Sequence, residues 1–145
     1  MNYSKLLDKR LIRVYRGSKA QAGRCLQLAR RDIKMSRRIV AEDWDWAFSI
    51  AYNAILQAGR ALMFYKGYRP TSGEGSHAVV VQFAEMTLGK DFENEVNLFN
   101  KMRKKRHEVM YDIAGIISES EARQALKFAD EFVGIVENYI EKGKK

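Results

Sequence analysis

The chain of 145 residues has little cysteine, proline or histidine. Cys25 is the single cysteine, which excludes an internal disulfide framework. One thiol and two histidines are also too few for a cysteine-based zinc site. The carboxylates are scattered, and no Glu-x-x-His pattern occurs in the predicted helices. We therefore expect neither a metal ion nor a cofactor.

Long apolar runs are absent as well. No stretch approaches the roughly 20 consecutive apolar residues that cross a bilayer as a helix. The N-terminal stretch, MNYSKLLDKRLIRVY, carries charges where a secretory signal peptide has its apolar part. From the sequence we expect no association with a membrane and a cytoplasmic location.

The remaining composition is that of an ordered domain. Hydrophobic residues make up 46% of the chain and charged residues 30%, which provides enough apolar surface for a core. The length fits one domain, and neither a long linker nor an internal repeat divides it. We expect a single helical domain over residues 1–145, with a basic N-terminal segment at about 1–15 and a loose tail at 142–145.

Positive charge exceeds negative charge and is unevenly distributed. The chain has 26 Lys and Arg against 18 Asp and Glu, a formal charge of +8. Residues 1–40 hold twelve basic and two acidic side chains, and five further basic side chains lie within 101–106. Such a basic face attracts polyanions. Nucleic acid or nucleotide is the favoured partner; a merely solvated surface and an acidic protein partner are the alternatives.

Helical periodicity runs through the whole chain. The only strand-like run, 79–81, lies within a helical pattern. In the clearest helix, small side chains recur at steps of four and three residues, which allows another backbone to approach closely; they are Ala47, Ala51, Ala54, Ala58 and Ala61. The pattern predicts helices at about 4–15, 18–38, 42–66, 77–88, 91–113 and 119–142. We expect an all-α fold, an up-and-down helical bundle of five to six helices.

Local signals mark several ends of these helices. Asp43 or Glu42 provides an acceptor at the start of the third helix. Gly67 suits a left-handed cap at its end. Ser118 and Glu121 have the spacing of a capping box, which places the start of the last helix just after Ser118.

The helix predicted at 91–113 has an unusual buried face. With 100° per residue, Arg103 and Arg106 fall in the middle of the apolar stripe that includes Phe99 and Met110. An unpaired buried charge is unfavourable by several kcal/mol. The arginines therefore either pair with buried carboxylates, lie where the helix leaves the bundle, or line a cleft and bind phosphate, for which the guanidinium fork is well suited.

A polar row lies beside these arginines, at Asn100, Arg103, His107 and Tyr111. It contains an amide, a cation, a proton acceptor and a hydroxyl, and cleavage of a phosphodiester uses such groups to move a proton and stabilise developing charge. The alternative is a histidine and a tyrosine that simply lie at the rim of the bundle. The row on its own favours the structural alternative.

The other histidine, His77, follows a glycine-containing loop at a predicted helix start. A helix N-terminus can bind an anion, and a histidine there can assist. A histidine in a first helical turn is nevertheless more often a surface residue, and this is the position that we predict for His77.

Residues 46–62, 67–70 and 77–80, followed by the run MRKKRHEVMYD at 102–112, together resemble the HEPN domain (higher eukaryotes and prokaryotes nucleotide-binding). The similarity extends from about residue 20 to 140. It implies an all-α bundle, usually a homodimer in which the motif helices of two protomers face each other across a cleft. Many HEPN proteins are metal-independent endoribonucleases of toxin or defence type. Others are non-catalytic binding subunits, and small prokaryotic members often partner a minimal nucleotidyltransferase.

The family's active pattern is an arginine, a polar residue, at least three further residues and a histidine. In this chain Arg106 takes the arginine position and His107 the polar one, while Tyr111 stands where the pattern has histidine. The pair Arg103 and His107 is one residue too close together. The chain thus resembles a variant branch of the family.

From this resemblance we expect RNA or nucleotide as the ligand and a homodimer, with a nucleotidyltransferase or antitoxin as the candidate protein partner. The expected catalytic residues are Arg106, His107 and Tyr111. The expected binding residues are Asn100, Arg103, Lys104 and Arg106.

Overall fold

The computed structural model describes residues 2–16, 18–71, 76–111 and 115–143. Its elements follow the chain as α1 (Ser4–Asp8), β1 (Ile12–Val14), α2 (Ser18–Ile39), α3 (Trp44–Tyr65), β2 (Tyr68–Pro70), α4 (Ser76–Leu88), the short 3-10 helix η1 (Lys90–Phe92), α5 (Glu93–Tyr111) and α6 (Glu119–Gly143). The expected all-α bundle is confirmed. None of the described helices combines the length and the apolar character that crossing a bilayer needs.

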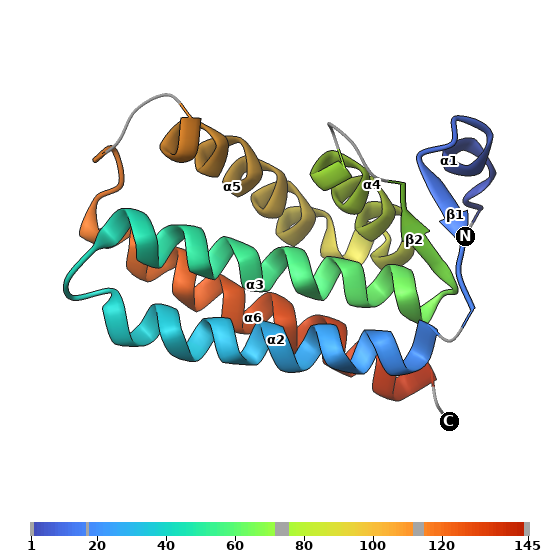
Figure 1. Ribbon diagram of the computed structural model, residues 1–145, viewed down its shortest axis with the longest axis horizontal. Coiled ribbons are helices and arrows are strands. Elements are labelled where there is room, and N and C mark those ends of the chain that lie inside the picture. The colour runs from blue at the N-terminus through green and yellow to red at the C-terminus, as the bar shows by residue number, and fades with distance from the viewer. Residues whose placement is uncertain (1, 17, 72–75, 112–114, 144–145) are drawn as a thin grey trace.

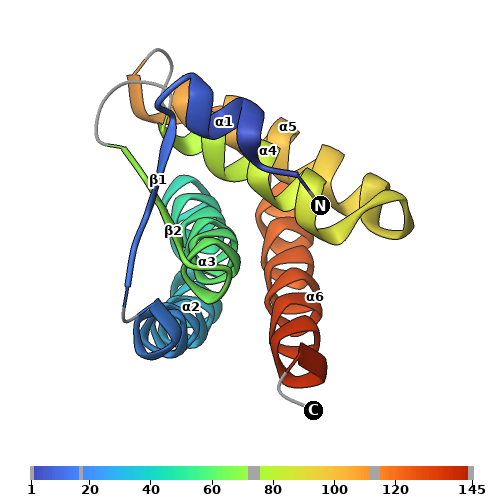
Figure 2. The same cartoon turned by 90° about the vertical axis from the view of Figure 1, so that its right-hand side faces the viewer.

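Three long helices form the body of the molecule. Helices α2, α3 and α6 run along its longest axis, while α5 and α4 lie across the other side of α3 (Figure 1). Seen from the end, α4 and α5 cover α3 and α6 as a separate layer (Figure 2). Helix α3 is therefore the central element, in contact with α2, α4, α5 and α6.

Helix α3 is central because it is apolar on most of its circumference. The five alanines of the small-residue stripe are fully buried. On the α2 side, the Ser36 hydroxyl donates a hydrogen bond to the Ala47 carbonyl, over 2.8 Å. Also between α2 and α3, the Asn53 side-chain amide donates to the buried Asp32 carboxylate over 2.9 Å. These bonds satisfy polar groups that burial would otherwise leave unpaired.

The predicted helix ends are largely correct. The Asp43 carboxylate accepts from the backbone N–H of Trp46 at the start of α3. Gly67, which follows the C-cap residue of α3, has a φ of 90°, the left-handed conformation that glycine adopts most easily. At the start of α6, Ser118 and Glu121 exchange two hydrogen bonds of 3.1 and 3.2 Å, so the capping box is confirmed.

The capping box leads to a direct prediction. Ser118→Ala removes the acceptor of the Glu121 backbone N–H and is expected to lower the free energy of unfolding by about 1 kcal/mol. Ser118→Asp keeps an acceptor at the same position and is expected to retain most of the stability. Urea denaturation followed by circular dichroism measures both variants. Absence of a loss in Ser118→Ala would show that the hydroxyl hydrogen bond does not stabilise α6.

The N-terminal segment differs from the prediction. The helix expected at about 4–15 ends at Asp8, and Arg10 has a positive φ of 57°. Residues Ile12–Val14 then form β1, which pairs antiparallel with β2. The reason is that Ile12 and Val14 are β-branched and find a strand partner in a part of the chain that was expected only to turn. The Ile12 side chain is buried, which anchors this pair of strands to the bundle.

Two further boundaries are corrected. The fifth helix begins at Glu93 and not at 91, because residues Lys90–Phe92 form η1 after Gly89, whose φ is 76°. Residues 142 and 143, which were expected in a loose tail, belong to α6. The predicted end of the fifth helix, at 112–113, lies outside the described residues, as do residues 144–145.

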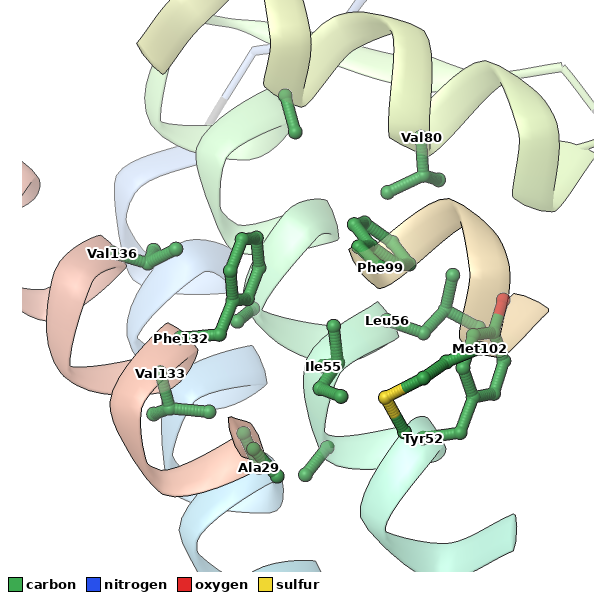
Figure 3. Packing of buried hydrophobic residues seen from close by; sticks show 14 of the residues in the cluster. Ala29, Tyr52, Ile55, Leu56, Val80, Phe99, Met102, Phe132, Val133 and Val136 are labelled. Carbon is green, nitrogen blue, oxygen red and sulfur yellow. The ribbon is translucent and has the colours of Figure 1, made fainter. Parts of the chain in front are cut away.

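The core between the two layers is built from aromatic and branched side chains. Phe99 of α5 contacts Phe132 of α6, with ring centroids 5.4 Å apart. Figure 3 shows Tyr52 beside Met102, on the side of this core away from Val133 and Val136. The backbone of α3 comes close to α4 and α5 at Gly59, where a Cβ would lie 2.5 Å from the Val80 side chain. The layer that carries the arginines of α5 is thus held tightly against α3.

Candidate functional site

A tyrosine and a histidine meet at the junction of α3 and α4. The Tyr52 side chain is fully buried on α3, and its hydroxyl lies 3.1 Å from Nδ1 of His77 in the first turn of α4. The two rings are tilted by 33°, with centroids 5.9 Å apart. His77 is half-buried, so the predicted surface position of this residue is wrong. Its side chain is held by a hydrogen bond to the central helix.

Arg106 of α5 covers the ring of this tyrosine. Its Cζ atom lies 5.6 Å from the centroid of the Tyr52 ring, a distance at which a cation is attracted to the aromatic face. The Arg106 Nε atom is buried and has no hydrogen-bond partner among the described residues. No carboxylate of the described residues forms an ion pair with this guanidinium. The positive charge is therefore held by the fold without being neutralised by that part of the chain.

Arg103 lies one turn before Arg106 and is also half-buried. Its Nε atom donates a hydrogen bond of 3.0 Å to the Asn100 Oδ1 atom, which fixes one edge of the guanidinium. Arg103 likewise forms no ion pair with a described carboxylate. Among the described residues, neither arginine pairs with a buried carboxylate, so the first of the three explanations given for them does not apply. The stripe is buried up to Met102, just before the two arginines, and Met110 beyond them is exposed, so α5 leaves the core along the stretch that carries Arg103 and Arg106.

Burial and the neighbouring arginines determine the pKa values of Tyr52 and His77. Burial raises the pKa of the Tyr52 hydroxyl to about 12, and the charges of Arg106, Arg103 and Arg60 act in the opposite direction. Burial also lowers the pKa of the His77 imidazole, and the same three guanidiniums lower it further. Both groups are consequently uncharged at neutral pH. They can exchange hydrogen bonds while the charge at this junction comes from arginine alone.

The other expected site residues lie elsewhere on α5. His107 and Tyr111 are exposed, with 70% of Tyr111 accessible to solvent, and their rings contact each other at a centroid distance of 4.8 Å. The Tyr52 hydroxyl is directed to His77 and not to this pair. Lys104 is exposed as well. The fold thus separates the predicted row into a half-buried part, Asn100 with Arg103, and a solvent-facing aromatic pair.

One residue of the predicted buried face is also placed differently. Met110 was expected on the apolar stripe of the fifth helix, but 44% of it is exposed. Its contact with the bundle is made by the sulfur atom, which lies 4.0 Å from the Ser49 hydroxyl of α3. Val96, Phe99 and Met102 are buried as the main part of the stripe.

Of the two residues at this junction, Tyr52 was not singled out from the sequence, and His77 was considered for anion binding but assigned to the surface. A weak signal for His77 exists: it precedes Val80 by three residues on α4, and such residues share one face of a helix. Val80 is buried against α3 at Gly59, so His77 also points to α3. Tyr52 precedes Gly59 by seven residues and lies on the same face of α3.

Metal-ligating groups do not gather at this junction. Within the part of the chain that the structure describes, no three His, Cys, Asp or Glu side chains lie close enough together to hold a metal ion. Cys25 is buried in the core, and burial raises the pKa of its thiol. The functional groups of the site are therefore guanidinium, imidazole, phenol and amide.

Comparison with known proteins gives two findings. A family model of the HEPN domain matches residues 15–139. The crystal structure of TT1696 from Thermus thermophilus has a TM-score of 0.62 and 20% sequence identity to this chain, and the match covers 81% of this chain and 97% of that one. At this level of identity the structural similarity shows the fold alone. No curated protein matches the sequence.

Proposed function

Because the chain belongs to the HEPN domain family, we propose that it binds RNA or nucleotide through a basic site built around Arg103 and Arg106 of α5. The observation that carries this proposal is the state of Arg106, a half-buried guanidinium whose buried Nε atom has no partner among the described residues. Because no described carboxylate neutralises the Arg106 guanidinium, its charge is available to an anion that binds from outside. The planar donor fork of arginine matches a phosphate group.

The surrounding charges support a polyanionic ligand over a single small anion. Lys101 and Lys104 belong to the same helix as the two arginines, and the chain as a whole is basic. Lys105 of this helix pairs with Glu121 of α6 over 3.8 Å. Cations on one helix attract the backbone of a nucleic acid independently of its sequence. Asn100 holds Arg103 in place and presents an amide for positioning the substrate.

The catalytic form of the proposal is a metal-independent endoribonuclease of toxin or defence type. In it Arg106 stabilises the charge that develops on the phosphate, and His107 or Tyr111 assists proton transfer. Because these two aromatic side chains face solvent, they are available to a substrate that lies between two copies. The site is then completed in a homodimer whose α5 helices face each other.

A second candidate function is a non-catalytic binding subunit that partners a minimal nucleotidyltransferase or an antitoxin. The observation that favours it is Tyr111, an exposed phenol in the place of the family's histidine. The basic site then binds RNA or nucleotide without cleaving it. Co-expression of this chain with a nucleotidyltransferase, followed by gel filtration of the purified material, tests the partnership.

The direct test separates binding from cleavage. The purified protein is incubated with mixed RNA in excess EDTA, and labelled single-stranded RNA is used for fluorescence anisotropy at a fixed salt concentration. We expect RNA binding that is lost in the variant Arg103→Ala/Arg106→Ala and kept in Arg24→Ala, which removes an exposed charge from α2. Cleavage in EDTA supports the ribonuclease, and binding without cleavage supports the binding subunit. Absence of binding by the unaltered protein would overturn both.

A further inference from the structure

The arrangement of α3, α4 and α5 suggests a more complete site than the motif helix alone. Resting on the proposed function, we infer that Tyr52 and His77 complete the phosphate site of Arg103 and Arg106 within one protomer, so that His77 is the histidine that contacts the bound phosphate. This residue lies outside the motif run at 102–112, and its role does not depend on a second copy of the chain.

The geometry brings the four side chains to one place from three helices. Tyr52 connects the other groups, since its hydroxyl reaches His77 and its ring face carries the Arg106 guanidinium. Arg103 follows on the same side of α5, and its charge acts on both Tyr52 and His77. The close approach of the helices at Gly59 holds this junction in position. A site whose parts are fixed by packing needs little reorganisation when a ligand binds.

The hydrogen bond to Tyr52 also assigns a task to the imidazole. A phenol that keeps its proton at neutral pH can donate a hydrogen bond to Nδ1 of a neutral histidine, and this arrangement has the imidazole proton on Nε2. An Nε2–H group is a donor to a phosphate oxygen. The described groups that act on this imidazole are Tyr52 and Arg60 from α3 and Arg103 and Arg106 from α5. The three cations disfavour its charged form only as long as no anion is present.

Phosphate binding is therefore expected to change the titration of His77. A bound dianion offsets the three guanidiniums and favours the charged imidazole, so the pKa of His77 is expected to rise. His107 is exposed and in contact with Tyr111, away from the Tyr52 hydroxyl. The chain has only these two histidines, so its imidazole spectrum contains two sets of signals.

The experiment follows both imidazoles by NMR in the full chain. The signals are assigned with His77→Gln and His107→Gln, and the unaltered protein is titrated with pH in the absence and presence of inorganic phosphate and of adenosine 5′-monophosphate. We expect both ligands to shift the His77 signals and raise the pKa of His77, with a smaller change at His107. Phosphate affinity is expected to fall at least about 10-fold in His77→Gln, as for loss of one hydrogen bond to a charged group, and to be unchanged in Arg24→Ala.

A variant of the tyrosine tests the connection between the two groups. Tyr52→Phe keeps the ring beneath Arg106 and removes only the hydroxyl. We expect it to remain folded by circular dichroism, to alter the His77 titration and to weaken phosphate binding less than His77→Gln does.

The possible failures are distinguishable. Phosphate and RNA binding that depends on Arg106 but leaves the His77 signals unmoved would overturn this inference and leave the proposed function standing. The same conclusion follows if the larger shift occurs at His107. Absence of any binding by the unaltered protein would overturn the proposed function, and the inference with it.

Discussion

Alanine in place of Gly59 is expected to lower the free energy of unfolding by up to about 2 kcal/mol, although alanine is the better helix former. The added Cβ would lie 2.5 Å from the Val80 Cγ1 atom and 3.3 Å from the Phe99 ring. Both neighbours are fully buried, and a valine in a helix has essentially one χ1 rotamer available. Overpacking of this kind is unfavourable by about 1–3 kcal/mol, which exceeds the gain in helix propensity of about 1 kcal/mol.

The matched control is the same substitution at Gly23 of α2. This glycine is exposed, and its Cβ would meet nothing within 4 Å. Gly23→Ala is therefore expected to raise the free energy of unfolding by up to about 1 kcal/mol. Urea denaturation gives both values, and a stabilising effect at Gly59 would show that α4 and α5 can move away from α3 easily. In that case the junction of Tyr52 and His77 would not be rigid.

Most of the fold could be predicted because its signals are local. The capping box at Ser118, the acceptor at Asp43 and the positive φ of Gly67 each depend on a few neighbouring residues. Strand β1 depends instead on pairing with β2, which lies beyond two long helices in the sequence. Apolar residues spaced for a short helix also fit a short strand, and only the tertiary partner decides between the two.

The candidate site also combines residues that the sequence of one helix reveals with residues that only the packing of several helices reveals. The helical wheel identified Arg103 and Arg106 because a charge on an apolar stripe is visible in a single helix. Tyr52 and His77 could not be found in this way, since a tyrosine in an apolar helix and a histidine in a first turn are both ordinary. Their connection appears only when α3, α4 and α5 are packed together. The exposed residues His107 and Tyr111, in contrast, were predicted as catalytic residues because they lie in the motif run at 102–112.

The substitution Arg106→Met is expected to weaken RNA binding strongly without weakening the fold. Loss of hydrogen bonds from a guanidinium to phosphate corresponds to about 1.5–3 kcal/mol, or about a 10- to 150-fold increase in Kd. In the unaltered protein the Arg106 Nε atom is buried without a partner among the described residues. Such an unpaired polar atom destabilises the folded state, and methionine removes it. Methionine retains much of the side-chain length and packs well against an aromatic ring such as Tyr52. Loss of the cation–π attraction offsets part of this stabilisation. The free energy of unfolding is therefore expected to stay constant or to rise by up to about 1 kcal/mol.

Arg30→Met provides the opposite control. The Arg30 guanidinium joins α2 to α6 through Asp130 and Glu137 and lies outside the site. Its loss is expected to lower thermal stability and to leave the anisotropy titration with RNA unchanged. The two arginines are thus predicted to differ in both measurements, because Arg30 is neutralised by described carboxylates and Arg106 is not. If Arg106→Met lowers the stability as Arg30→Met does, and RNA affinity stays the same, then Arg106 is a structural residue and the phosphate site must lie elsewhere.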